Sequence, residues 1–78
     1  MTRIYIVDTG NNRIVVAKRT AVETIEVVQI IDSFKGAENN TFNGLTDVAV
    51  DEDGFIYIAD QNNARILKLD QDLYCRYW

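Results

Sequence analysis

The feature that most constrains this chain is an internal repeat with an offset of 52 residues. Residues 4–16 align without gaps to residues 56–68, and seven of the thirteen positions are identical. Self-similarity of this kind is typical of repeat architectures, in which similar units pack against one another. The 78-residue chain is therefore expected to fold as two related units.

Each copy of the repeat has the pattern of a β-hairpin. The run Ile-Tyr-Ile is followed by a polar cluster and then by a second apolar run, which predicts two strands joined by a loop of about four residues. The runs are apolar at almost every position, as in strands that are covered on both faces.

The remaining sequence adds further strands to both hairpins. Residues 24–31 also carry apolar residues at helical spacing, but their valine and isoleucine content favours a strand. The predicted fold is all-β, with two antiparallel meanders that have the strand number and spacing of β-propeller blades. Seven strands are expected, near residues 3–7, 13–18, 24–31, 46–50, 55–59, 65–69 and 73–78. The expected units are a truncated first blade (1–34), a connection (35–45) and a second blade (46–78).

Residues 4–14 and 56–66 resemble the core of an NHL repeat, and residues 42–54 resemble its other half. The resemblance implies four-stranded blades around a central channel, with residues 47–50 as the innermost strand of the second blade. It also implies that the first blade lacks its inner strand, so that the chain is part of a larger or oligomeric propeller. Two departures from the family pattern are Leu45, in place of proline, and Asp47, in place of glycine near the channel mouth.

Two charged pairs, Asp8 with Arg13 and Asp60 with Arg65, bracket the two hairpin loops. Strand pairing brings the side chains of each pair together. Because the pair recurs in both copies, the favoured interpretation is structural, with each aspartate accepting backbone N–H groups of its turn while the arginine holds the aspartate in place. The alternative is a row of arginines that binds a ligand.

In a propeller, these hairpin loops and the connection between blades emerge on one face, where propellers commonly bind partners. A polar rim of this kind suits a protein or a small polar ligand, although asparagine is also an ordinary turn residue. The candidate binding residues are Asn11, Asn12, Asn39, Asn40, Asp47, Asn62 and Asn63.

Composition excludes several classes of function. The chain has no histidine and a single cysteine, Cys75, which excludes a Ser-His-Asp triad, a Cys-His pair and an internal disulfide. The net charge of −4 argues against nucleic-acid binding. The acidic run 51–54 lacks the ligands of a calcium loop and predicts a turn. No metal or cofactor is expected. With no signal peptide or membrane span in sight, a cytoplasmic location is the default expectation.

The sequence therefore predicts a non-enzymatic propeller segment that is a scaffold for protein–protein interaction or self-assembly. The alternative is a fragment of a propeller enzyme, a hydrolase or lyase, with its catalytic residues outside this chain. Two blades cannot close a ring, and they leave apolar faces and open strand edges in water. The expected partners are thus other copies of the chain, as a homo-oligomer, or the rest of a longer propeller, with no nucleic acid and no membrane.

Overall fold

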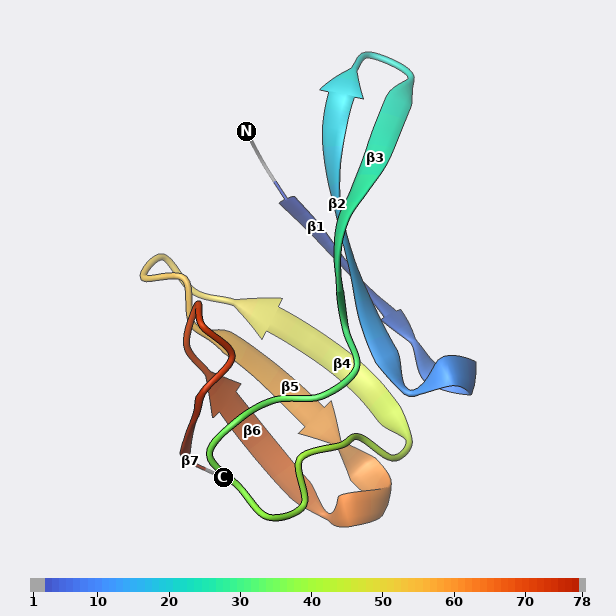
Figure 1. The fold of residues 1–78 in the computed structure, drawn as a ribbon. Coiled ribbons are helices and arrows are strands. Elements are labelled where there is room, and N and C mark those ends of the chain that lie inside the picture. Colours follow the sequence, from blue (N-terminus) through green and yellow to red (C-terminus); the bar gives the residue numbers. More distant parts are fainter. Residues whose placement is uncertain (1–2, 78) are drawn as a thin grey trace.

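Seven strands form two antiparallel sheets in the computed structural model, which describes residues 3–77. Neighbours in each sheet follow the order of the sequence, so both sheets are meanders (Figure 1). Sheet one contains β1 (Arg3–Asp8), β2 (Arg13–Ala21) and β3 (Thr24–Ile31). Sheet two contains β4 (Leu45–Val50), β5 (Ile56–Asp60), β6 (Arg65–Leu69) and β7 (Cys75–Tyr77).

The predicted all-β fold of two blade-like sheets with three and four strands is confirmed. Residues 24–31 form strand β3, so the helical alternative for this segment is wrong. The last predicted strand is shorter than expected, since β7 covers Cys75–Tyr77. Trp78, the final residue of that prediction, lies outside the described residues.

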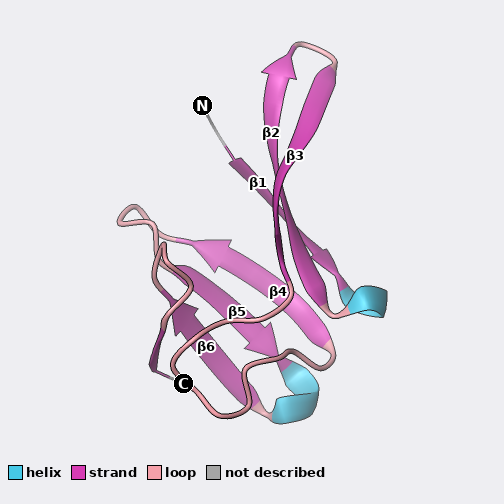
Figure 2. Ribbon diagram, in the orientation of Figure 1, coloured by secondary structure: helices cyan, strands magenta, loops and turns pink. Residues whose placement is uncertain are grey.

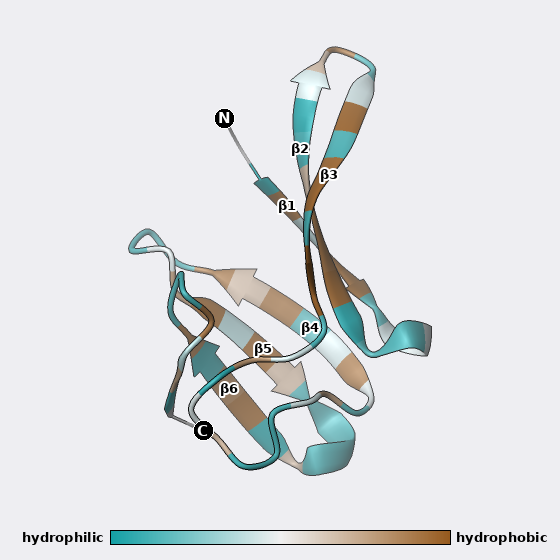
Figure 3. Cartoon of the chain, viewed as in Figure 1, coloured by the Kyte–Doolittle hydropathy of each residue, from teal (hydrophilic) through white to brown (hydrophobic). Residues whose placement is uncertain are grey.

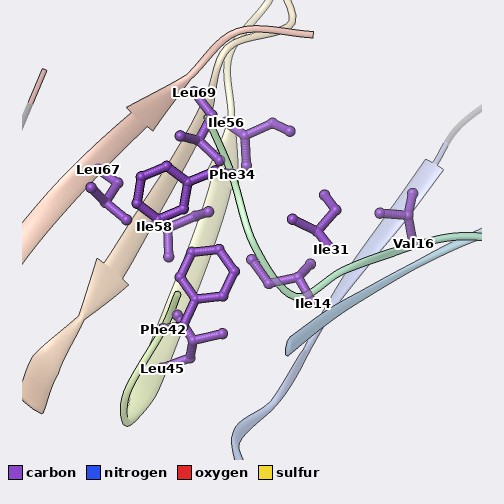
Figure 4. Packing of buried hydrophobic residues seen from close by; sticks show 10 residues of the cluster. All are labelled: Ile14, Val16, Ile31, Phe34, Phe42, Leu45, Ile56, Ile58, Leu67 and Leu69. Carbon is purple, nitrogen blue, oxygen red and sulfur yellow. The ribbon is translucent and has the colours of Figure 1, made fainter. Parts of the chain in front are cut away.

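One hydrophobic core joins the two sheets. Ile14 and Ile31 of sheet one are buried in the same cluster as Ile58 and Leu67 of sheet two (Figure 4). Strand alternation explains the choice of residues, because Ile14 lies opposite Ile31 across the β2–β3 pair and shares its face. The face of sheet one that carries Ile14 and Ile31, called its back below, is thereby packed against the face of sheet two that carries Ile58 and Leu67, called its front below.

The connection between β3 and β4 crosses sheet two and completes this core. Its two phenylalanines, Phe34 and Phe42, are almost fully buried, and their rings stack with centroids 5.5 Å apart. Backbone hydrogen bonds of Lys35 with Leu73 (2.8 Å) and Cys75 (2.7 Å) hold the start of the connection beside β7. The connection is therefore a packed part of sheet two.

Two positions that depart from the family pattern lie in β4. Leu45 is fully buried in the core, so hydrophobic packing holds the first residue of the strand. Asp47 is exposed, and its Oδ1 accepts a hydrogen bond from the N–H of Val48 (2.8 Å).

Candidate functional site: the turn face

The two hairpin turns of the repeat have the same backbone conformation. Each is a single 3₁₀ turn, Thr9–Asn11 in turn one and Gln61–Asn63 in turn two. Each ends on a left-handed residue, Asn12 (φ 50°, ψ 48°) or Ala64 (φ 52°, ψ 45°). Both turns lie at the same end of the molecule (Figure 2). The repeat in sequence is therefore a repeat in structure, and this end is called the turn face below.

In turn two, the Asp60 carboxylate is fully buried and is satisfied from two sides. Its Oδ2 accepts hydrogen bonds from Arg65 Nε and Asn63 Nδ2, both at 2.8 Å. Its Oδ1 accepts the backbone N–H of Asn43, at 2.7 Å, from the connection. The buried charge is thus paired and hydrogen-bonded, which is the condition under which a charge is tolerated inside a protein.

The Arg65 guanidinium also holds the connection through two backbone carbonyls. Nη1 donates to the carbonyl oxygen of Asn39 (2.9 Å) and Nη2 to that of Thr41 (2.8 Å). The same guanidinium lies over the ring of Phe34, 5.3 Å from its centroid. The side chains of Asp60 and Arg65 therefore hold residues 39–43 through the backbone atoms of that segment.

Turn one contains the same pair in a more open setting. Asp8 Oδ2 accepts hydrogen bonds from Asn11 Nδ2 (2.9 Å) and from Arg13 Nε (2.8 Å). These bonds, that from Asn11 first, lower the pKa of Asp8 below its ordinary value. The side chains of Asp8 and Arg13 are 30% and 37% exposed, against 0% and 10% for the buried pair of turn two.

The role of the two aspartates differs from the expected one in detail. Asp8 and Asp60 are the N-cap residues of the two turns, but neither carboxylate accepts a backbone N–H of its own turn. Beside the arginine five residues later, each accepts a hydrogen bond from the side chain of the asparagine three residues later, in place of a turn amide. A charged arginine donates a stronger hydrogen bond to a carboxylate than a neutral backbone amide of the turn does.

Turn one also contacts the entry to sheet two. Asn12 Oδ1 accepts the N–H of Gly44 at 2.9 Å, and Thr9 Oγ1 donates to the carbonyl of Leu45 at 2.8 Å. The equivalent positions in turn two hold Ala64 in place of Asn12 and Gln61 in place of Thr9, so the side chains of this pair of contacts are not conserved between the two turns. The two bonds tie sheet one to the first residues of β4.

The other candidate residues are distributed unevenly. Asn62 donates from Nδ2 to Oδ1 of Asn43 (3.0 Å), and the carbonyl of Asn40 accepts the N–H of Phe34 (3.0 Å). Asn11, Asn12, Asn39, Asn40, Asn62 and Asn63 thus all lie in or against the turn face. Asp47 takes no part in these contacts.

The acidic run is a hydrogen-bonded turn between β4 and β5. Asp51 Oδ1 accepts the N–H groups of Asp53 and Phe55, both at 3.0 Å, and Oδ2 accepts the hydroxyl of Tyr57 at 2.9 Å. Burial raises the pKa of Asp51, but these hydrogen bonds outweigh it and leave the pKa lowered. Gly54 has φ +87°, which L-residues rarely adopt. Within residues 3–77, no group of three or more histidine, cysteine or acidic residues could hold a metal ion.

The backbone groups of the connection that contribute to the turn face could not be found from the sequence. The carbonyls of Asn39 and Thr41 and the amide of Asn43 carry no side-chain signal. A usable signal was present in Phe34 and Phe42, because two aromatic residues in an otherwise polar connection indicate that it is packed.

A four-stranded antiparallel meander that packs face to face with a second meander is the blade of a β-propeller-type repeat protein. The family can be given more closely. Residues 42–69, from the connection to the end of β6, match the model of the NHL repeat. No curated protein and no solved structure matches the chain. None of the described helices has the length and apolar character needed to cross a membrane.

Proposed function

We propose that this chain is a non-enzymatic propeller segment whose function is protein–protein contact, including contact between copies of itself. The observation that carries the proposal is one exposed apolar face of sheet one, here called the front face. Strand register aligns Ile4, Ala17 and Val27 in one row of it, and Ile6, Val15 and Ile30 in the next. Its exposed members are Ile4 (42%), Ile6 (40%), Ile25 (59%), Val27 (55%) and Ile30 (49%).

The hydropathy colouring shows this apolar character along β1 and β3 (Figure 3). Single exposed apolar residues are common on protein surfaces, but a contiguous apolar face of a sheet marks an interaction surface. The residues are also β-branched and rigid, so they lose little side-chain entropy when covered. Contact with another protein removes this surface from water.

Sheet two has a complementary open surface on its back face. Ile66 in β6 is 58% exposed, whereas its repeat counterpart in β2, Ile14, is fully buried. The difference arises because sheet two covers the back of sheet one, and no described residue covers the back of sheet two in the same way. The chain thus leaves open the front of sheet one and the back of sheet two. Inside the chain, the opposite faces, the back of sheet one and the front of sheet two, pack together.

This function includes no catalysis, because Asp60, Arg65 and Asn12 of the turn face support structure. Asp60 and Arg65 hold the connection, and Asn12 holds the start of β4. A catalytic acid or base needs a hydrogen-bonding site that a substrate can reach. The buried Asp60 carboxylate offers none.

Size-exclusion chromatography with light scattering tests the proposal directly. The wild-type chain is expected to show a mass above the 8.9 kDa of one chain, rising with concentration. Val27→Lys places a charge in the front face and should yield monomers. The matched control Val22→Lys changes a residue that is 81% exposed at the β2–β3 hairpin tip, outside the front face, and should assemble like wild type. A wild-type monomer at high concentration contradicts self-assembly.

A further inference from the structure

We propose that Asn43 is a site of deamidation, and that the hydrogen bond from the Gly44 N–H to Asn12 restrains the reaction in the folded chain. Asn43 is the only asparagine in the sequence that is followed by glycine. Glycine has no Cβ beside its backbone nitrogen, so this nitrogen can approach the side-chain carbonyl of the preceding residue with little steric hindrance. Asn43 is also exposed, so water and hydroxide ions can reach it.

The modification needs only solvent as its reagent. Solvent base removes the proton of the Gly44 N–H, and the nitrogen attacks Cγ of Asn43. As the N–Cγ bond forms, the Cγ–Nδ2 bond breaks, and the amide group takes up a proton and leaves as ammonia. Water then opens the cyclic imide at either of its two carbonyl carbons, which yields aspartate or isoaspartate at position 43. The net change replaces one amide group with one carboxyl group, without oxidation or reduction.

In the folded chain, both reacting groups are held by hydrogen bonds. The N–H of Gly44 donates to Oδ1 of Asn12 in turn one, at 2.9 Å. Because the Asn12 amide oxygen is a neutral acceptor, it stabilises the protonated form of the nitrogen and opposes the loss of its proton. Oδ1 of Asn43 accepts a hydrogen bond from Nδ2 of Asn62 at 3.0 Å, which restricts the side-chain rotation that the attack requires.

The restraint on the nitrogen differs from the others because it comes from the other sheet. Asp60 accepts the N–H of Asn43 (2.7 Å), and the carbonyl of Asn43 accepts the N–H of Asn62 (3.0 Å), so these bonds lie within sheet two and its connection. Asn12 belongs to turn one of sheet one. The Gly44 nitrogen is therefore protected only while turn one contacts the start of β4.

The two products differ in their effect on this contact. Aspartate leaves the backbone unchanged and keeps an oxygen that can accept from Asn62. Isoaspartate adds a methylene group to the main chain between the N–H held by Asp60 and the N–H held by Asn12. The spacing of these two groups then changes, so both hydrogen bonds cannot be kept as they are. Formation of isoaspartate thus weakens the contact that restrained the reaction.

Mass spectrometry of the intact chain in mildly alkaline buffer measures the rate, and peptide mapping locates the modified residue. The wild-type chain is expected to react at Asn43, more slowly when folded than in denaturant. Asn12→Ala removes the acceptor and should react about fivefold faster than wild type, the factor that corresponds to the loss of one neutral hydrogen bond. Alanine is accommodated at this position of the turn, since Ala64 has the same conformation in turn two.

Two further variants are the controls. Asn12→Asp keeps an acceptor oxygen at this position and should react no faster than wild type. Thr9→Val removes the other hydrogen bond between turn one and β4, that to the Leu45 carbonyl, and should also react like wild type because the Gly44 N–H stays bound. In denaturant all four chains should react at the same rate, since these hydrogen bonds are then absent.

Three results would overturn the proposal. Absence of reaction at Asn43 in denaturant contradicts the site itself. Equal rates for the folded wild-type and Asn12→Ala chains contradict the restraint. Equal acceleration by Asn12→Ala and Thr9→Val also contradicts it, because the effect then comes from general loosening of the chain and not from the Gly44 hydrogen bond.

Discussion

At the level of single residues, the two turns differ most at the position that closes them. Asn12 and Ala64 both have left-handed backbone, which costs an L-residue about 1 kcal/mol and which asparagine tolerates best after glycine. Ala64→Asn is therefore expected to raise the free energy of unfolding by about 1 kcal/mol, a rise of several degrees in Tm by circular dichroism. The reciprocal control, Asn12→Ala, should lower Tm, since it also removes the acceptor for the Gly44 N–H. An unchanged Tm for both variants contradicts this account.

Gly44 is a second position where backbone conformation decides the residue. Its φ is +69°, and a Cβ added there would lie 2.6 Å from Nδ2 of Asn62. Gly44→Ala is expected to destabilise the chain by about 1–3 kcal/mol through backbone strain and displacement of that amide. Gly10→Ala is the matched control, because its Cβ would meet nothing within 4 Å and its φ is not positive. Chemical denaturation should show a loss for the first variant only, and equal loss in both would contradict the argument.

At the level of elements, the sequence predicts the structures that are determined by neighbouring residues and misses those that depend on residues far along the chain. The hairpins were predictable because their apolar runs and turn residues lie next to one another, as in residues 4–14. The burial of Phe34 and Phe42 depends instead on a sheet formed by residues far along the chain. The hydrogen bonds from Arg65 to the backbone carbonyls of Asn39 and Thr41 could not be predicted for the same reason, since every residue has the same backbone groups whatever its side chain.

The turn between β6 and β7 is held together by the carboxylate of Asp70, so we expect its stability to depend on pH. Asp70 Oδ1 accepts the N–H groups of Tyr74 (3.0 Å) and Asp72 (2.9 Å), and Oδ2 pairs with Arg76 (2.7 Å). These contacts, that with Tyr74 first, lower the pKa of Asp70 below 3.8. A lowered pKa in the folded state means that the stabilisation is present above pH 3.8 and is lost as pH falls through the folded value.

The corresponding experiment measures Tm against pH for Asp70→Asn. The variant should be less stable than wild type at pH 7, and the difference should shrink as pH falls below about 4. Asp72→Asn is the control, since it removes the same charge from the same turn but leaves the hydrogen bonds to Asp70 in place. A constant difference between Asp70→Asn and wild type across the pH range would show that the carboxylate's ionisation is not what stabilises the turn.

At the scale of the whole molecule, the internal packing of the two sheets is a template for contact between copies. Inside the chain, the back of sheet one is packed against the front of sheet two. The surfaces left open are the front of sheet one and the back of sheet two, around Val27 and Ile66. Repetition of the same packing joins these two unlike surfaces, which makes the contact heterologous, head to tail, and able to close into a ring. The competing arrangement joins two front faces about a two-fold axis.

Mixing two variants distinguishes these arrangements. In head-to-tail contact, Val27→Lys and Ile66→Lys should each be monomeric alone, because each lacks one of the two required surfaces. An equimolar mixture should then form a complex of two chains and no larger species, since the intact back of one variant meets the intact front of the other. Front-to-front contact predicts that Ile66→Lys assembles by itself and that Val27→Lys stays monomeric in the mixture. Light scattering resolves the two outcomes, because a pair has twice the 8.9 kDa mass of one chain.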